Sequence, residues 1–266
     1  MNSKRIVLII GCILFIGATG ILFMFKSSNG FVGDSNEKVI EDRTFSNIEV
    51  LADNAAVEIV PGNDSATTVN YSGQSKRKSK TIFKADVKGD TLVVQLKEKR
   101  RGFFHFGMPS FDLQLTVTIP EKQYDKIQAE SDNGHIKVEN IHTNALILET
   151  DNGSIRLKNI EATSVDVKSD NGKIILDQVD GTIQGKTDNG AISLTTNNLD
   201  RPIQLKTDNG RIEIQTEKEP ENATIDAKTD IGKIEIFGHE TKQTTFGKGE
   251  HLIKLRTDNG GITVTK

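Results

Sequence analysis

The chain has 266 residues and a formal net charge of −3, a length that suits one or two domains. Hydrophobic residues make up 35% of it and charged residues 27%, so its core should be thin for the chain's size. A single cysteine excludes an internal disulfide, and a chain without tryptophan and with two tyrosines offers few aromatic platforms for a carbohydrate-binding groove.

The N-terminal residues differ in composition from the rest. Lys4 and Arg5 precede an uncharged run over residues 6–25, and as a helix these 20 residues would span about 30 Å, the thickness of a bilayer core. A signal peptide has a shorter apolar centre before its cleavage site, whereas this run continues past the small residues at 17–20. We therefore expect residues 6–25 to form an uncleaved transmembrane anchor.

The charges around this run indicate its orientation. Lys4 and Arg5 stand before it and Lys26 directly after it, so the positive-inside bias places the N-terminus in the cytoplasm. Residues 1–5 would then be a cytoplasmic stub, and the bulk of the chain would be extracytoplasmic. Cys12 also resembles a bacterial lipidation signal, but we interpret it as an ordinary cysteine inside the spanning helix.

Beyond the anchor, the pattern changes twice. Residues 26–38 are small, polar and aperiodic, which predicts a short tether. From Val39 onward, alternating apolar and polar residues predict strands, and no 12-residue window shows helical spacing. We expect residues 39–266 to form one all-β extracytoplasmic domain.

A repeat built on Asp-Asn-Gly dominates this domain. The six copies are Asp132-Asn133-Gly134, Asp151-Asn152-Gly153, Asp170-Asn171-Gly172, Asp188-Asn189-Gly190, Asp208-Asn209-Gly210 and Asp258-Asn259-Gly260. A seventh, degenerate copy is Asp230-Ile231-Gly232. In all seven, Ser or Thr stands one place before the Asp, and aliphatic residues stand five places before, four after and six after it. This register predicts stacked repeats around a continuous narrow core.

An earlier copy marks the start of the repeat. Asp53-Asn54-Ala55 has Ile48 five places before it and Val57 four places after it. The repeat therefore begins at about residue 39. Residues 61–120 interrupt it with longer strands, which we interpret as an insertion or a wider starting sheet.

The triplet predicts a turn, in one of two architectures. Asn and Gly tolerate positive φ, and Asp can hydrogen-bond to nearby amides. Asn-Gly between alternating runs is typical of a hairpin, so a stack of hairpins is one architecture. The other is a parallel β-solenoid, in which each copy is one coil and the triplet is its corner. Apolar residues nine places after the Asp favour the solenoid because they suit a second, inward-facing corner; these are Ile141, Ile160 and Val179.

In a solenoid, equivalent residues stack into ladders along the axis. Lys168, Lys186 and Lys206 stand two places before the Asp, and their like charges would repel. The neighbouring Asp row could offset this repulsion because residues two apart share a face. At the corner, replacing Gly190 by Val should cost roughly 1 kcal/mol or more through a strained φ.

The whole layout resembles a known family. A spanning N-terminus, a strand ending in proline ("LQLTVTIP", 113–120) and serial Ser/Thr-Asp-Asn-Gly copies are similar to the bacterial "putative adhesin" family of repeat β-proteins. Within it, the layout is similar to the LiaG-like, membrane-anchored members encoded with the cell-envelope stress system of Bacillus-type bacteria. The resemblance covers about residues 39–266. It implies a β-solenoid-like fold, a surface location and no catalytic residues.

The stacked Asp residues raise the question of calcium, which takes six to eight oxygen ligands. The calcium-binding β-helix repeat has nine residues, whereas this period is near 19 with one Asp per copy. Each Asp could instead brace its own turn. The five histidines, including His135 and His142 in one copy, lack zinc-ligand spacing. We expect no metal and no cofactor, with calcium at the corners as the alternative.

The most unusual stretch is residues 76–106. Between residues 76 and 101, ten Lys or Arg residues face three Asp or Glu residues. Basic residues beside aromatic ones suit an anionic membrane surface or a polyanion. The candidate contact residues are Lys99, Arg100, Arg101, Phe103 and Phe104. The alternative is a charged hairpin whose Phe side chains cap the end of the solenoid.

These observations predict a non-catalytic, membrane-anchored surface protein, an adhesin-like β-repeat scaffold linked by the resemblance to the cell-envelope stress response. The expected partners are the membrane and an envelope protein or cell-wall polymer, and the extracytoplasmic location argues against nucleic acid. Two alternatives stay open. One is a β-helix enzyme acting on wall polysaccharide, which would need a carboxylate pair in a groove. The other is a lipid- or polyanion-binding module that uses residues 76–106.

Overall fold

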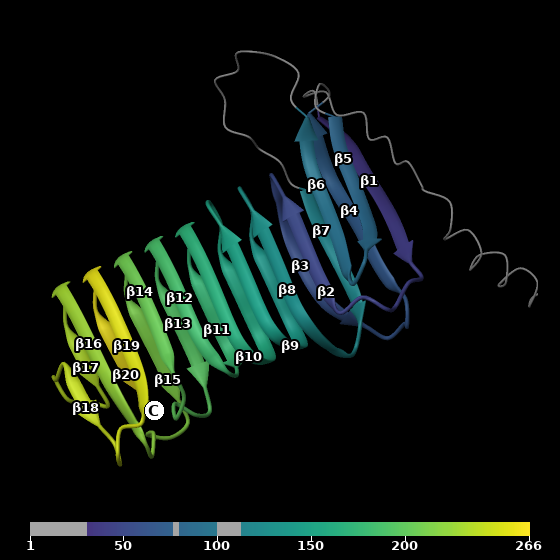
Figure 1. Ribbon diagram of the computed structural model, residues 1–266. Coiled ribbons are helices and arrows are strands. Elements are labelled where there is room, and N and C mark those ends of the chain that lie inside the picture. Colours follow the sequence, from purple (N-terminus) through teal and green to yellow (C-terminus); the bar gives the residue numbers. More distant parts are fainter. Residues whose placement is uncertain (1–30, 77–79, 100–112) are drawn as a thin grey trace, which may run out of the picture.

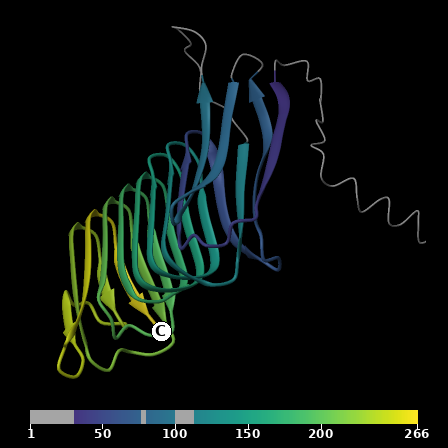
Figure 2. The ribbon, with the colours of Figure 1, turned by 45° about the vertical axis from the view of Figure 1, so that its right-hand side comes forward.

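The computed structural model describes residues 31–76, 80–99 and 113–266, so the predicted anchor lies outside the described residues. The described chain forms strands and no helix, as the sequence predicts. Within these ranges, no helix is long and apolar enough to cross a membrane. The strands build an elongated stack of slices (Figure 1), and seen from the side each slice is a loop of chain (Figure 2).

The described residues contribute twenty strands to the stack. They are β1 (Phe31–Ile40), β2 (Asn47–Ala52), β3 (Ala55–Gly62), β4 (Thr67–Lys76), β5 (Lys80–Lys88), β6 (Thr91–Lys99), β7 (Leu113–Pro120), β8 (Gln123–Ser131), β9 (Ile136–Thr150), β10 (Ile155–Asn171), β11 (Ile174–Val179), β12 (Thr182–Asn189), β13 (Ile192–Thr196), β14 (Ile203–Asn209), β15 (Ile212–Thr216), β16 (Ala223–Ile231), β17 (Ile234–Ile236), β18 (Gln243–Thr245), β19 (His251–Asn259) and β20 (Ile262–Thr265).

The strands form two faces. The inbound face holds the strands that run into the triplet corners, together with β5, β6 and β18 at its ends. Its order is β5, β6, β2, β8, β9, β10, β12, β14, β19, β16, β18. The outbound face holds the strands that leave these corners, together with β1, β4 and β7 at its N-terminal end. Its order is β1, β4, β7, β3, β9, β10, β11, β13, β15, β20, β17. All interior pairings are parallel. The fold is therefore a β-solenoid and not a stack of hairpins.

The repeated aliphatic residues build the core between the two faces. Those five places before the Asp, four after and six after are all buried, and none is more than 7% exposed. Parallel register stacks each on its equivalent, as Ile155 on Ile174 and Leu157 on Leu176. Burying one such side chain contributes about 1.5–3 kcal/mol, so the repeat itself supplies the main stabilisation.

The Ser or Thr before each triplet binds the neighbouring coil. Its hydroxyl donates to the backbone carbonyl of the corner in the adjacent coil, at 2.8–3.1 Å. The pairs are Ser131 to Ala55, Thr150 to Gly134, Ser169 to Gly153, Thr187 to Gly172, Thr207 to Gly190, Thr257 to Gly210 and Thr229 to Gly260. The small polar residue is required here because only a short hydroxyl reaches this carbonyl.

Replacing Thr187 by Val should lower the free energy of unfolding by about 1–2 kcal/mol, because the variant keeps the shape but leaves the Gly172 carbonyl without its donor. Urea denaturation measures this change. Thr182→Val is the matched control on the same strand, at an exposed position, and should change stability by less than about 0.5 kcal/mol. Equal losses in both variants would contradict this role for the buried hydroxyl.

The corner glycines have a steric role, and the predicted strained φ is wrong for most of them. Gly134, Gly153, Gly172, Gly190 and Gly210 do not have positive φ. At each of them, a Cβ would lie only 1.8–2.0 Å from the backbone carbonyl oxygen of the adjacent corner. The glycines are needed because neighbouring coils touch there.

Positive φ occurs instead at the second corner, on residues that are not glycine. Asn140, Asn159 and Gln178 have φ of 55°, 51° and 52°. Asn and similar polar residues accept this region at modest cost. The residues that follow them, Ile141, Ile160 and Val179, are at most 2% exposed. The predicted second inward-facing corner is therefore confirmed.

The Asn of each triplet forms an amide ladder. The side-chain Nδ2 donates to the Oδ1 of the Asn in the adjacent coil, at 2.9–3.1 Å. The ladder runs through Asn54, Asn133, Asn152, Asn171, Asn189, Asn209 and Asn259. None of these Asn residues has positive φ, so the turn chemistry predicted for them is also wrong. The residue type is set by contacts between coils.

Chain order and spatial order differ at both ends of the stack. The last coil in sequence, β19 and β20, lies between the β14–β15 coil and the β16–β17 coil. At the other end, the β2–β3 coil lies between the β6–β7 coil and the β8–β9 coil. Residues 61–120 are therefore not a simple insertion, because they supply β6 and β7 of the coil at this end and the antiparallel strands β4 and β5 that pair with it.

Antiparallel strands close both ends. At the N-terminal end, Asp34 accepts hydrogen bonds from the Tyr71 hydroxyl (2.8 Å) and the Thr81 hydroxyl (2.5 Å), which joins β1 to β4 and β5. Burial and the Asp34 carboxylate raise the pKa of Tyr71, so its hydroxyl stays a donor. Tyr71 also packs edge-on against Phe83, with ring centroids 5.0 Å apart. Because β1 begins at Phe31, the predicted tether is wrong for residues 31–38.

Candidate functional surfaces

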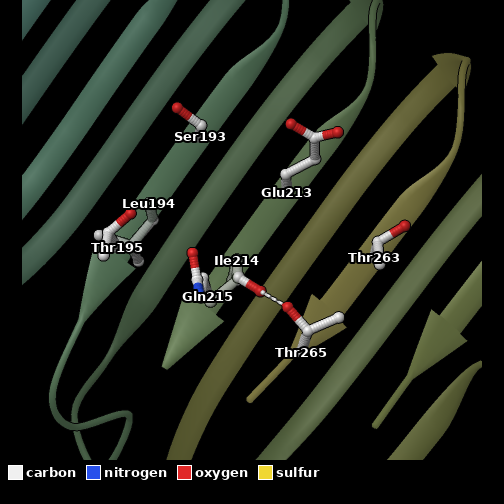
Figure 3. Close-up of a pocket in the computed structure, with 8 residues that line it drawn as sticks. All are labelled: Ser193, Leu194, Thr195, Glu213, Ile214, Gln215, Thr263 and Thr265. Atoms are coloured by element: carbon white, nitrogen blue, oxygen red, sulfur yellow. Dashed lines mark hydrogen bonds between the residues drawn. The ribbon is translucent and has the colours of Figure 1, made fainter. Parts of the chain in front are cut away.

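A shallow hollow of about 250 Å³ lies on the outbound face. Its outward side chains form two rows across β13, β15 and β20 (Figure 3). One row is Ser193, Glu213 and Thr263, and the other is Thr195, Gln215 and Thr265. The rows follow from the period-two alternation of each strand, which turns every second residue outward. The hollow is thus lined by hydroxyl, amide and carboxylate groups.

The hollow does not contain the groups that a glycosidase would need. Its single carboxylate is Glu213, which binds the Arg211 guanidinium at 2.8 Å. Hydrolysis of a glycosidic bond ordinarily uses two carboxyl groups, about 5–10 Å apart. This surface is suited to binding polar groups.

On the inbound face, a row of Lys–Asp ion pairs runs along the stack beside the Asp-Asn-Gly corners, with one pair in each coil that has it. Lys and Asp two residues apart lie within 3.0–3.9 Å of each other in four coils. The pairs are Lys168–Asp170, Lys186–Asp188, Lys206–Asp208 and Lys228–Asp230. Hydrogen bonding to Asp208 raises the pKa of Lys206, which keeps the amine charged. The predicted offset of the stacked lysines by the Asp row is confirmed in these coils, and this surface is close to neutral.

Nearer the N-terminal end the same corner is acidic. Asp53, Asp132 and Asp151 are adjacent in the stack, and the position two before them holds Leu51, Glu130 or Glu149 instead of Lys. Burial, then the charges of Asp53 and Asp151, raises the pKa of Asp132. The row therefore carries an electrostatic cost.

Among the described residues, no three His, Cys, Asp or Glu side chains lie together in an arrangement that could hold a metal ion. His135 and His142 each contact the adjacent coil. His135 Nδ1 lies 3.1 Å from the Ser154 backbone nitrogen, and His142 Nδ1 lies 3.0 Å from the Glu161 carboxylate. Both histidines serve coil-to-coil contacts.

Asp132→Asn should stabilise the solenoid at pH 7. Because the pKa of Asp132 is raised in the folded state, its charged form lowers the free energy of unfolding at pH values above that pKa. This loss of stability vanishes once the pH falls below 3.8, the pKa of the unfolded state. For a solvent-screened repulsion we expect about 0.5 kcal/mol, or a melting temperature about 1–2 °C higher at pH 7 and unchanged at pH 3. Asp188→Asn, which removes the partner of Lys186, is the control and should give no gain. A gain for Asp132→Asn that persists at pH 3 would show that charge is not its cause.

The predicted membrane-contact residues lie at the edge of the described chain. Lys99 ends β6, and Arg100, Arg101, Phe103 and Phe104 fall outside the described residues. Their role stays a prediction. The structure does place four neighbouring lysines that the sequence did not single out, Lys80, Lys84, Lys88 and Lys97, on exposed positions of β5 and β6. Lys80, Lys84 and Lys88 are an even number of residues apart, so they lie on the same side of β5, and this spacing was the sequence signal that could have revealed them.

Comparisons with known proteins found one similar sequence and several similar structures. In sequence, this chain is similar to the uncharacterized protein YvlB of Bacillus subtilis (strain 168), with 27% identity over 111 residues. The match covers 38% of this chain and 28% of YvlB. Among solved structures, a "putative cell adhesion protein" from Clostridium sporogenes has 13% identity and a TM-score of 0.44, with 88% of this chain and 99% of that one covered. A "putative adhesin" from Bacteroides fragilis has 11% identity and a TM-score of 0.44, with 87% and 97% covered.

The family model described as Toastrack DUF4097 matches residues 45–182 and 149–265. The two matched segments overlap and together reach from the start of the repeat to the last strand. They include every parallel coil of the solenoid. The chain belongs to the Toastrack DUF4097 family, as the sequence resemblance predicted.

Proposed function

We propose that this chain is a non-catalytic scaffold on the outer face of the bacterial cell membrane, held there by residues 6–25. The observation that carries the proposal is the shape of the solenoid, which has two long faces (Figure 1). Polar side chains alternate outward along the strands of these faces, and a shallow hollow lies on the outbound face. Equivalent groups recur at the strand spacing of about 4.8 Å. Such a surface suits an extended partner, either an envelope protein or a cell-wall polymer.

The link to envelope stress rests on the sequence resemblance to the LiaG-like members. A continuous hydrogen-bonded stack is stiff along its axis, because each coil is fixed by two neighbours. A stiff stack tethered to the membrane would hold its binding faces at a set height above the lipid. This arrangement fits a protein that senses or shields the envelope, and it needs no chemistry of its own.

Labelling in intact cells tests the placement. In Bacillus subtilis producing the Cys12→Ser chain, a cysteine at the exposed Thr182 should react with a membrane-impermeant maleimide before lysis. The chain should also stay in the membrane fraction after carbonate washing. Native Cys12, inside the apolar run, is the control and should not react. Reaction of the Thr182→Cys chain only after lysis, or release by carbonate, would contradict the anchored, outward placement.

A deletion strain tests the role in envelope stress. Loss of the chain should lower survival under a cell-wall antibiotic several-fold, and the wild-type chain should restore it. Crosslinking in intact stressed cells should then recover a specific envelope protein or polymer. Survival equal to that of the parent strain across wall and membrane antibiotics would remove the stress assignment and leave the placement as a separate question.

A further inference from the structure

The N-terminal end of the inbound face carries a cluster of exposed lysines, here named the β5 lysine patch: Lys80, Lys84 and Lys88 on β5, and Lys97 on the adjacent β6. We propose that this patch contacts the headgroups of anionic phospholipid in the membrane that anchors the chain. The proposal deepens the proposed function, on which it rests, because it names the surface that faces the lipid.

The patch has an excess of positive charge. Among the described residues, none of its four lysines has a carboxylate within salt-bridge distance. The carboxylate that shares the outer side of β5 is Asp86, and it already binds Lys38 at 2.6 Å. Lys97 lies next to the corner of Asp53, so the three β5 lysines are the strongest members.

The lysines further along the same face differ. Lys186 and Lys206 bind the Asp two places on at 3.1 and 3.0 Å, and Lys168 binds Glu149 at 2.5 Å. Lysines of the same face therefore differ in their surroundings, because Lys168, Lys186 and Lys206 each bind a carboxylate and, within the described chain, the lysines of the β5 lysine patch do not. The β5 lysine patch therefore offers an approaching anion positive charge that no bound carboxylate of the described residues offsets, unlike Lys168, Lys186 and Lys206.

The position of the patch favours lipid over a soluble polymer. Phe31 pairs with Lys76 at the end of β4, and Thr81 near the start of β5 donates a hydrogen bond to Asp34 near the start of β1, so β1 and β5 begin at the same end of the sheet. Five residues, 26–30, separate β1 from the apolar run, and fully extended they reach at most about 17 Å. If the run spans the bilayer, this end of the solenoid cannot leave the headgroup region by more than that distance.

The shape of the patch also fits a flat partner. Its β5 lysines are four residues apart, which spreads them over about 27 Å of one strand. Long lysine stems can bring each ammonium group to the plane of the headgroups. Each basic residue near an anionic leaflet strengthens the contact by about five-fold, so the three β5 lysines together should do so by about 100-fold.

The full chain in nanodiscs provides the test. Brief labelling with an amine-reactive reagent, followed by mass spectrometry, measures the reaction rate of each lysine in phosphatidylcholine discs and in discs containing phosphatidylglycerol. In the anionic discs, Lys80, Lys84 and Lys88 should react at least five-fold more slowly, Lys97 should also be protected, and high salt should restore the rates. Lys168, Lys186 and Lys206 of the same molecules are the internal control and should not change. Equal rates for Lys80, Lys84 and Lys88 in the two kinds of disc would overturn the proposal.

Matched variants separate charge from fold. In anionic discs, Lys80→Thr, Lys84→Thr and Lys88→Thr combined should abolish the protection of Lys97, whereas Lys168→Thr, Lys186→Thr and Lys206→Thr combined should leave it intact. Adding a soluble glycerol-phosphate polymer to phosphatidylcholine discs tests the other occupant, and protection there without protection by phosphatidylglycerol would overturn the lipid assignment. A chain that fails to enter discs contradicts the anchor instead. In that case, sedimentation of the two triple variants with phosphatidylglycerol vesicles decides the patch, and equal binding by both would overturn it.

Discussion

Replacing Gly190 by alanine should lower the free energy of unfolding by about 3 kcal/mol or more. A Cβ at this position would lie 2.0 Å from the Gly172 carbonyl oxygen and 2.6 Å from its carbonyl carbon. Both atoms belong to the backbone of the adjacent coil, which is held by hydrogen bonds on either side. Relief would require the coils to separate at the corner, so the cost should reach the upper end of overpacking effects. Urea denaturation, with the m-value as a check on two-state behaviour, measures it.

Two further substitutions identify the cause. Gly190→Asn should be as harmful as Gly190→Ala, because both add a Cβ at the point of contact. If the backbone conformation were the cause, Asn would be tolerated better, since it accepts positive φ more readily than alanine. Gly261→Ala is the matched control at a neighbouring corner, where the nearest atom to a Cβ is 3.3 Å away, and it should cost less than about 1 kcal/mol. A clear advantage of Asn over alanine at residue 190 would contradict the steric explanation.

Ile253→Ala should cost about 2–5 kcal/mol, although the residue is close to the C-terminus of the chain. Ile253 is fully buried and pairs with Ile203 on one side and Ile225 on the other. Its coil therefore lies inside the stack, and a cavity there also weakens the outer coil. Hydrogen exchange should show lost protection in β16 and β17 as well as in β19 and β20. Ile203→Ala is the matched control, with the same expected cost.

Cysteine crosslinking checks this spatial order independently. In a Cys12→Ser chain, Asn209→Cys with Asn259→Cys should form a disulfide, because these residues pair directly and their side-chain amides are 3.0 Å apart. Asn209→Cys with Ile231→Cys should not, since two strand spacings of about 4.8 Å exceed the reach of a disulfide. Loss of protection confined to β19 and β20 in Ile253→Ala, or crosslinking of the second pair, would contradict the internal position of this coil.

The core and the parallel stacking could be predicted because every copy of the repeat has the same pattern of aliphatic residues. Ile155 and Leu157 alternate with polar residues, and the same register returns in every copy. The second corner was predictable for the same reason, since Ile160 and its equivalents keep their place. A pattern carried by one copy of the repeat is enough to locate its buried side.

The reasons behind the triplet could not be predicted from one copy. The atom that excludes a side chain at Gly190 belongs to Gly172, and the partner of Asn171 is Asn152. Both contacts run between coils, so local preferences for positive φ offered a plausible but wrong reason. The preferences of Asn and Gly for isolated turns say nothing about contacts that form only when coils stack on one another.

The order of the end coils could not be predicted either. Ile225 and Ile253 both stand five places before the Asp of their copies, so their position in the repeat does not say which coil lies beside Ile203. Which of the two coils lies outermost depends on the lengths of the connections and on β18, which pairs with β16 and closes that edge of the sheet. For the candidate surface, the parity of Lys80, Lys84 and Lys88 was visible in the sequence, but the single carboxylate beside them is paired by Lys38 from a distant strand.

The Asn ladder ends at Asn259, because the outermost coil has Ile231 at that position, 70% exposed. A side chain with no donor or acceptor cannot extend a row of amides to a second molecule. Stacks of identical coils with matching amide rows are the geometry from which open-ended fibres grow. Ile231 therefore ends the amide row at this end of the stack, so the row cannot continue into a second molecule there.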